Sequence, residues 1–300
     1  TFALDEKTYA TPGFAEQELV RVSEIGFMRG VRIFALDYFP VRYDPVQNSL
    51  RIVQEASVRI DFEHPDLIAT AELLAKTGSW EFDRMYAQSL FNWEQNDRTS
   101  LVRYPTKILI LCPPNYVSTL QTYVDWKKQQ GYNVVVTTVG TGGTVTNSVS
   151  AIKTYMAGVW SAATAQDPAP TYLLIVGDTS TSGDNIIASP ATVTSPSNDH
   201  VTDNYYVRLQ GTDYVPEMYY GRFSVSSATE LTNVITKTMT FEKTLMPSLS
   251  YLGNAVMIAG ADATYAPTYG NGQINYGTTH YFNATNGITS DTYLYPASAS

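Results

Sequence analysis

The pattern of hydrophobic and polar positions changes near residue 100 and divides the chain into two segments. In the first segment, short runs rich in Val, Ile, Phe and Arg predict strands at residues 18–22, 30–36, 39–43 and 50–62. Residues 58–62 alternate strictly between polar and apolar, which is typical of a half-buried sheet. Helical spacing at 68–76 and 82–93 predicts two helices in a charged connector. Residues 1–103 are therefore predicted to be a β-rich, sandwich-like segment followed by this connector.

From residue 105 onward, predicted strands and helices alternate. Continuous apolar runs at 107–111, 172–176 and 255–259 predict buried strands, and weaker patterns predict strands at 133–139, 204–209 and 218–223. Helices are predicted at 116–130, 148–160 and after Ser227, where Ser227 and Glu230 form a capping box. This alternation predicts an open parallel α/β sheet with flanking helices, whose site lies beyond the carboxyl ends of the strands. Cys112, Asp178 and Asp262 fall at those ends.

Composition narrows the function classes. The net charge is −9 and only 16% of residues are charged, so a nucleic-acid backbone is not the expected partner. Residues 1–100 carry 10 basic and 16 acidic side chains, whereas residues 101–300 carry 9 and 12. No apolar run approaches the ~20 residues of a transmembrane span. With Cys112 as the single cysteine, an intrachain disulfide is excluded. Low charge with abundant Thr, Ser and Tyr suits an exported protein, and the absence of an initiator Met indicates an internal piece of a longer precursor.

Three features resemble chemical sites but have simpler explanations. The glycine-rich stretch 140–143 joins a strand to a helix, yet it lacks the Lys of a phosphate-binding loop. Cys112 has no neighbouring His in the sequence to activate it and is interpreted as a core residue. His200 lies between Asp199 and Asp203 in the sequence, but a loop histidine beside Asp is commonly just hydrogen-bonded. For each of the three the simpler explanation is preferred, and only the glycine-rich stretch enters an alternative hypothesis below.

Three acidic residues leave alternatives open. Asp213 and Glu217 lie four residues apart in a tight turn, which indicates either a calcium site or an acidic surface turn. Asp262 follows a predicted strand, where a carboxylate either orients a catalytic His or caps the next turn. The residues alone do not separate these readings.

Five motifs resemble the gingipain family of cysteine endopeptidases. They are YVDWKKQQG at 123–131, YLLIVGD at 172–178, TDNYY at 202–206, GTDYVPEMYYGRFS at 211–224 and MIAGAD at 257–262. The resemblance runs in order from about Tyr104 to Asp262, and residues 1–103 resemble the end of the family's β-sandwich prodomain. It implies a caspase-like α/β fold, with a first subdomain at 104–250 and the start of a second at 251–300.

The resemblance also implies a Cys–His catalytic dyad, with the His in a Gly-His-Gly motif. Neither member is present, because His64, His200 and His280 are not flanked by glycines and Cys112 follows the wrong strand. The dyad is therefore expected beyond residue 300. Asp262 matches the family's third acid, which orients the catalytic His, and the family's structural calcium strengthens the calcium reading of Asp213 and Glu217.

Two further positions follow from the resemblance. Asn275 falls where the family carries the Asp that binds a basic P1 side chain, and a neutral amide cannot pair with Arg or Lys as a carboxylate does. Arg103 and Tyr104 flank the bond at which the family's precursors are cut.

The resulting hypothesis is a secreted or cell-surface peptidase precursor acting on proteins or peptides, with its own prodomain as a partner. Alternatives are a non-catalytic surface or secretion module of the same fold, and a nucleotide-binding domain using residues 140–143.

Overall fold

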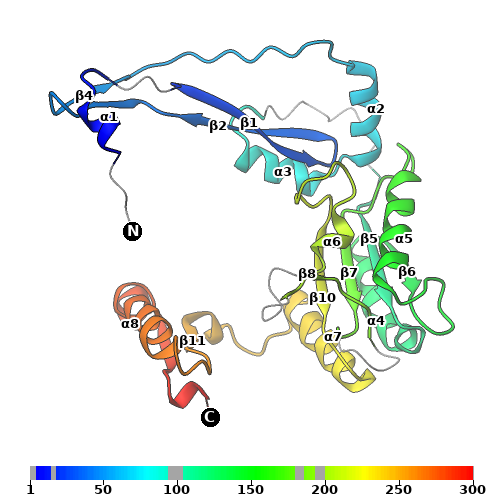
Figure 1. Cartoon of the computed structure of the whole chain (residues 1–300). Coiled ribbons are helices and arrows are strands. Elements are labelled where there is room, and N and C mark those ends of the chain that lie inside the picture. The colour runs from blue at the N-terminus through cyan, green and yellow to red at the C-terminus, as the bar shows by residue number, and fades with distance from the viewer. Residues whose placement is uncertain (1–4, 15–17, 94–103, 180–185, 193–199, 300) are drawn as a thin grey trace. The chain divides into compact units, whose positions relative to one another are not determined.

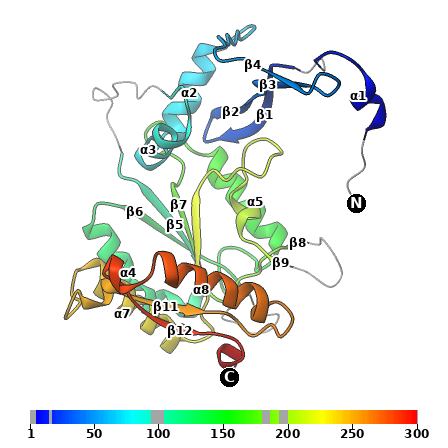
Figure 2. The ribbon, with the colours of Figure 1, turned by 90° about the vertical axis from the view of Figure 1, so that its left-hand side faces the viewer.

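The computed structural model describes residues 5–14, 18–93, 104–179, 186–192 and 200–299. The chain forms two compact units, Thr1–Ile235 and Thr236–Ser300, which are described separately below (Figures 1 and 2). In the part of the chain described, no helix has the length and apolar character that crossing a membrane requires.

The first unit begins with a short helix and two β-hairpins. Helix α1 (Glu6–Ala10) precedes β1 (Val20–Met28) and β2 (Val31–Tyr38), which pair antiparallel, as do β3 (Val41–Asp44) and β4 (Ser49–Ile52). A two-residue turn joins β1 to β2, with Arg29 at φ 48° and Gly30 at φ 84°. Positive φ at both residues is the signature of a type I′ turn, whose twist matches that of the flanking strands.

The strand predicted at 50–62 ends at Ile52, so this prediction is wrong for residues 53–62. Val58, Ile60 and Phe62 are all exposed, and no strand among the described residues pairs with them. An alternating pattern forms a strand only where a neighbour accepts its backbone hydrogen bonds. The two predicted connector helices are confirmed as α2 (Leu67–Thr77) and α3 (Trp80–Ser89).

The predicted parallel sheet is confirmed as the centre of this unit. Its strands are β5 (Lys107–Cys112), β6 (Asn133–Thr138), β7 (Tyr172–Val176) and β10 (Tyr219–Phe223). They are all parallel and lie in the order β10-β7-β5-β6. Every carboxyl end therefore lies at one edge of the sheet and every amino end at the other.

Helices pack on both faces of this sheet. Helix α5 (Val149–Ser161) buries Ile152 and Met156 in one cluster with apolar side chains of β5 and β7. Helix α4 (Val117–Gln129) follows the 3₁₀ turn η1 (Pro114–Tyr116) and lies on the other side, where its Tyr123 ring contacts Phe223 of β10. Because helices cover both faces of the sheet, side chains on both sides of β5 and β7 are shielded from water, and both strands are continuously apolar.

The segment between β7 and β10 differs from its prediction. The strand expected at 204–209 is instead a short helix, α6 (Asn204–Val207), and the two short strands β8 (Ala191–Thr192) and β9 (His200–Val201) precede it. Tyr206 and Val207 of α6 are both buried in one cluster with apolar side chains of β5 and β7. The apolar residues at 204–209 therefore reflect burial in the core and not a strand.

Helix α7 (Ala228–Glu242) leads from the first unit into the second, and Glu230 N–H donates to Ser227 Oγ as the capping box predicts. The second unit pairs β11 (Asn254–Ile258) with β12 (Thr289–Tyr293) in parallel. Helix α8 (Asn271–His280) lies between them in the chain. The short turns of this unit are η2 (Ser250–Gly253), η3 (Ala266–Gly270), η4 (Ala284–Asn286) and η5 (Ala297–Ala299).

The second unit confirms the strand predicted near 255–259 but not its burial. Val256 and Ile258 of β11 are 60% and 65% exposed. One crossover helix can cover only one face of a two-stranded sheet, so a continuous apolar run does not ensure burial on both faces.

Candidate functional site

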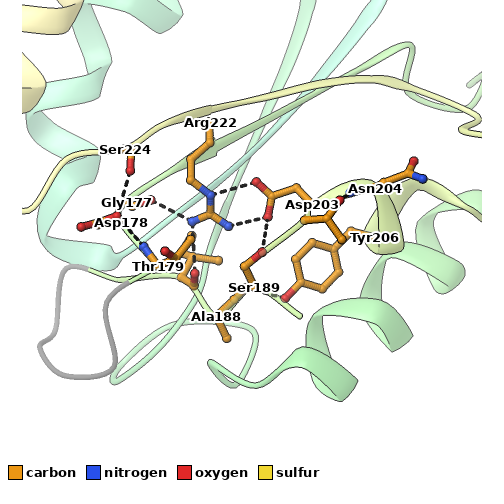
Figure 3. Close-up of polar contacts among 12 residues, drawn as sticks. Gly177, Asp178, Thr179, Ala188, Ser189, Asp203, Asn204, Tyr206, Arg222 and Ser224 are labelled. Atoms are coloured by element: carbon orange, nitrogen blue, oxygen red, sulfur yellow. Dashed lines mark hydrogen bonds and ion pairs between the residues drawn. The ribbon is translucent and has the colours of Figure 1, made fainter. Parts of the chain in front are cut away.

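At the carboxyl edge of the sheet, Arg222 of β10 organises a polar network (Figure 3). Its Nε and Nη2 donate to the two carboxylate oxygens of Asp203 at 2.9 and 2.7 Å. Its Nη1 donates to the carbonyls of Gly177 and Ile187 at 2.8 and 3.1 Å. The Arg222 and Asp203 side chains are only 8% and 14% exposed, so this bidentate pair is shielded from water and largely neutralised.

Asp178, directly after β7, supplies a negative charge beside this pair. Its Oδ1 accepts hydrogen bonds from Ser224 Oγ at 2.8 Å and from the Thr179 N–H at 2.7 Å. The bond from Ser224, followed by that from Thr179, lowers the pKa of Asp178 below its ordinary value. The carboxyl edge therefore presents one ionised carboxylate next to a neutralised Arg–Asp pair.

Further hydrogen bonds hold the described parts of the long connection between β7 and β10, residues 186–192 and 200–209. Ser189 Oγ donates to Asp203 Oδ1 at 2.8 Å, and Tyr206 Oη donates to the Ala188 carbonyl (Figure 3). Asn147 adds two bonds, to the Ile186 carbonyl and from the Ala188 N–H. Residues 186–189 and 203–206 are thereby bound to each other and to the Arg222 network.

The sequence analysis did not identify the Asp203–Arg222 pair, although both residues lie in motifs that carry the resemblance. They are 19 residues apart, so no local spacing marks them as partners. The available signal was the position of Arg222 near the end of a strand, because a buried guanidinium requires acceptors.

Cys112 lies at the end of β5 and is fully buried. Burial raises the pKa of its thiol to about 12, so the residue stays protonated at neutral pH. This confirms its interpretation as a core residue. The glycine-rich loop closes on itself, since the N–H groups of Gly140, Gly143 and Val145 bind carbonyls within residues 138–145. Those three N–H groups are not available to a phosphate.

The residues predicted to bind calcium lie at the opposite, amino edge of the sheet. Asp213 is half-buried; its Oδ2 accepts the Phe27 N–H at 2.9 Å and its Oδ1 accepts the Val215 N–H at 2.8 Å. Glu217 is fully buried, and its Oε2 accepts the Leu209 N–H. Its Oε1 has no hydrogen-bond partner among the described residues.

Burial raises the pKa of Glu217 to about 7, an effect that the bond from Leu209 opposes. In the described ranges, no group of three or more His, Cys, Asp or Glu side chains is close enough to hold a metal ion. The calcium site therefore stays a prediction, with Glu217 Oε1 as the oxygen left for a cation.

Of the predicted processing site, the structure describes Tyr104, which lies at the amino edge. Tyr104, just before β5, is 43% exposed and lines a groove of about 410 Å³, which the end of α2 and the start of α3 also line. Arg103 lies outside the described residues.

Asp262 and Asn275 lie in the second unit. Asp262 is exposed, and its Oδ1 accepts the N–H groups of Thr264 and Tyr265 at 2.7 and 3.0 Å. It thus caps the turn after β11, and its Oδ2 makes none of these bonds. Asn275 is an exposed residue of α8. The catalytic role of Asp262 and the substrate-binding role of Asn275 stay predictions.

Comparison with known proteins places this geometry in a family. A family model described as "Peptidase family C25" matches residues 102–297, and one described as "Propeptide_C25" matches residues 1–101. The chain belongs to peptidase family C25. It is 37% identical over 296 residues to Lys-gingipain HG66 of Porphyromonas gingivalis, and 25% identical over 270 residues to Gingipain R2 of the same species.

These matches cover 98% and 89% of the chain, but only 16% and 34% of the two gingipains. A solved chain titled "Structure of Protease" is 32% identical, with a TM-score of 0.52 over 66% of this chain and 43% of that one. The chain thus spans a small part of its curated C25 relatives.

The family boundary at residues 101 and 102 gives the first unit two parts. Both hairpins, α2 and α3 lie in the propeptide part, whereas the parallel sheet lies in the peptidase part. The bond from Phe27 to Asp213 crosses this boundary, as does a 2.8 Å bond from the Gly30 N–H to Gln210 Oε1. The C25 propeptide is thus hydrogen-bonded to the amino edge of the peptidase sheet.

Proposed function

We propose that this chain is part of a cysteine endopeptidase precursor with a caspase-like catalytic fold and a sandwich-like prodomain. The observation that supports it most is the match of the peptidase model to residues 102–297, which includes the whole parallel sheet. In the proposed mechanism, a cysteine thiolate attacks the substrate's peptide carbonyl while a histidine acts as general base and then as general acid.

The proposed nucleophile and histidine lie in the protein beyond residue 300. Cys112 is unsuited to attack because its thiol is fully buried and its pKa is raised to about 12. Asp262 is proposed to orient the histidine, through the carboxylate oxygen that does not cap the turn after β11. It is a positioning residue in this proposal.

The substrates are proposed to be proteins or peptides. Names of relatives include "Lys-gingipain", but Asn275 is neutral at the position proposed to meet the P1 side chain. A carboxylate favours a P1 cation by charge pairing, which an amide cannot supply. We therefore expect no strong preference for Lys or Arg over neutral P1 residues of similar length.

Maturation is proposed to occur by cleavage between Arg103 and Tyr104, which releases residues 1–103 as a prodomain. The family boundary at 101 and 102 lies within two residues of this bond. The mature enzyme is proposed to be secreted or held at the cell surface, with no nucleic-acid partner, in line with its net charge of −9.

Calcium is proposed as a structural ion near Glu217 and Asp213. Three of their four carboxylate oxygens accept backbone N–H groups, so Glu217 Oε1 is the one left to a cation. Calcium takes six to eight oxygens, so backbone carbonyls would have to complete the shell. The test is thermal unfolding with and without calcium, and an unchanged midpoint in calcium would contradict the proposal.

The activity is tested by comparing residues 1–300 with the same chain extended along its reading frame. We expect hydrolysis of casein, blocked by iodoacetamide, only for the extended protein. Cys112→Ser serves as the matched control and should leave that hydrolysis intact. An extended protein without thiol-dependent hydrolysis would favour the non-catalytic module, and hydrolysis by residues 1–300 alone would overturn the assignment of the dyad.

A further inference from the structure

Arg29 of the propeptide part is buried within the first unit, with only 1% of its surface exposed. The residue occupies the first position of the β1–β2 turn at φ 48°, a conformation that costs a side-chain-bearing residue free energy and that Gly or Asn adopts more readily. Sequence preference for the turn therefore does not explain an arginine at this position. A strained, buried residue persists only where its surroundings hold it.

Four backbone carbonyls surround the guanidinium of Arg29. Its Nε donates to the Thr77 carbonyl at 2.6 Å, within the propeptide part. Its Nη1 donates to the carbonyls of Pro170 and Glu217, both at 2.7 Å, and its Nη2 to that of Ala169 at 3.2 Å. The last three belong to the peptidase part and lie just before β7 and β10. We call these three carbonyls the arginine socket.

Aromatic rings complete the surroundings of Arg29. The guanidinium lies 5.0 Å from the ring centroid of Phe82 on α3 and 5.6 Å from that of Trp160 on α5. Phe82 belongs to the propeptide part and Trp160 to the peptidase part. Both distances are within the range of cation–π attraction, which is stronger where water is excluded.

The turn around Arg29 is fixed from both sides. Thr77 Oγ1 donates to the Arg29 carbonyl at 2.9 Å, and Tyr86 Oη donates to that of Met28 at 2.7 Å. On the peptidase side, Asp213 and Gln210 accept the N–H groups of Phe27 and Gly30. The turn thus presents one guanidinium and two backbone donors to one surface.

We propose that Arg29 is the anchor by which the propeptide part stays bound to the peptidase part after the chain between them is cut. This inference rests on the proposed function, since it supposes a precursor that is processed. The partner recognised by the arginine socket is a guanidinium carried on a type I′ turn. Lysine cannot replace it, because one ammonium group on a flexible stem does not span four acceptors.

Replacement of Arg29 by a residue without a donor would leave the socket carbonyls of Ala169, Pro170 and Glu217 without this partner while the two parts are docked. Loss of one partner of a buried hydrogen bond to a charged group has a large cost, because the remaining group must be desolvated alone. The exposed Arg32 on the same hairpin is a matched contrast. It pairs with Glu24 at the surface, within the propeptide part, and its side chain is 52% exposed.

The test uses the full chain with residues 96–101 replaced by the recognition sequence of a site-specific viral protease. Cleavage by this added protease is independent of any activity of the protein itself, so failure of the proposed peptidase function does not affect the outcome. After cleavage, size-exclusion chromatography and biolayer interferometry report whether the two pieces remain associated.

We expect the cleaved wild-type pieces to elute together, and those of Arg29→Gly to separate with affinity reduced about a hundredfold or more. Glycine suits the positive φ of the turn, so this substitution removes the guanidinium without adding backbone strain. Arg29→Lys should restore little of the affinity, Arg32→Ala should behave as wild type, and ethylguanidinium should partly restore association of the Arg29→Gly pieces.

Association of the Arg29→Gly pieces with wild-type affinity would overturn the proposal, as would equal loss for Arg32→Ala. If Arg29→Gly does not fold before cleavage, Arg29→Lys decides instead. It keeps the positive charge but cannot reach all of the carbonyls that Arg29 binds. About tenfold weaker association or more supports the proposal, and wild-type affinity of the Arg29→Lys pieces overturns it.

Discussion

Glu217 is an acidic side chain that loses all contact with water when the chain folds. Its pKa rises to about 7 in the folded state from an ordinary value of 4.5. Between these values the unfolded chain has released this proton and the folded chain has kept it, so stability falls as pH rises from about 4.5 to 7. Below this window the full contribution is present, and above it the loss is complete.

We expect Glu217→Gln to remove this dependence. Urea unfolding at pH 5 and pH 7.5 should show the wild type losing about 1–3 kcal/mol more than the variant over this interval. Asp178→Asn is a useful comparison because the pKa of Asp178 is lowered in the folded state. Its contribution to stability is therefore lost as pH falls, and not as pH rises. Parallel pH profiles for wild type and Glu217→Gln would show that Glu217 is already ionised at pH 5.

A second prediction at the residue scale concerns the contribution of Arg222 to stability. Its planar group binds Asp203 with two nitrogens and reaches two carbonyls with the third. Arg222→Lys keeps the charge but cannot make this fork, so we expect a loss of about 2–4 kcal/mol in urea unfolding. The control is Arg32→Lys, whose exposed pair with Glu24 should contribute under about 1 kcal/mol. Equal losses for the two variants would contradict a structural role of the buried pair.

At the scale of elements, Lys153 of α5 holds α6 in place. Its Nζ donates to the carbonyls of Tyr205 and Arg208, which are orphan groups at the end of that short helix. Lys153→Met should therefore raise hydrogen exchange about tenfold or more at residues 204–210 and leave β5 and β7 unchanged. Lys128→Met, an exposed position on α4, is the control. No local rise at 204–210 would show that packing of Tyr206 and Val207 is sufficient.

The elements that were predicted correctly have a pattern that can be recognised within a few neighbouring residues. Strands β5 and β7 are buried on both faces, so their apolar runs are local and unambiguous. Residues 58–62 and 204–209 were predicted wrongly because pairing and burial decided their structure. The Asp203–Arg222 pair and the Arg29 socket join residues that are far apart in the sequence. Such contacts cannot be predicted from the spacing of residues in a single sequence. Candidate positions such as Asp178 could be predicted, since strand ends can be located.

At the scale of the molecule, the first unit uses the two edges of its sheet differently. The carboxyl edge holds Asp178 and the Arg222 pair, whereas the amino edge holds Asp213, Glu217 and the propeptide turn. Because the propeptide turn contacts the amino edge, it does not cover the carboxyl edge, where sheets of this type have their functional sites. In the described residues, these hydrogen bonds from the propeptide part therefore lie at the edge remote from the Arg222 network.

This arrangement predicts that the β1–β2 hairpin unfolds together with the parallel sheet. The N–H groups of Phe27 and Gly30 donate to side chains of the peptidase part, at Asp213 and Gln210. In contrast, Leu50 of the β3–β4 hairpin is 62% exposed. We expect exchange at the amides of Phe27 and Gly30 to be about a hundredfold slower or more than in β3–β4, and close to that of β5.

Residue-resolved hydrogen exchange by NMR on the uncut chain measures these rates. Gln210→Ala should speed exchange at Gly30 alone, because it removes one acceptor and leaves the Arg29 bonds in place. If Arg29→Gly brings both amides to the rate of β3–β4 while β5 stays protected, the arginine couples the hairpin to the sheet. If Phe27 and Gly30 already exchange as fast as β3–β4 in the wild type, the two parts fold independently and the coupling is refuted.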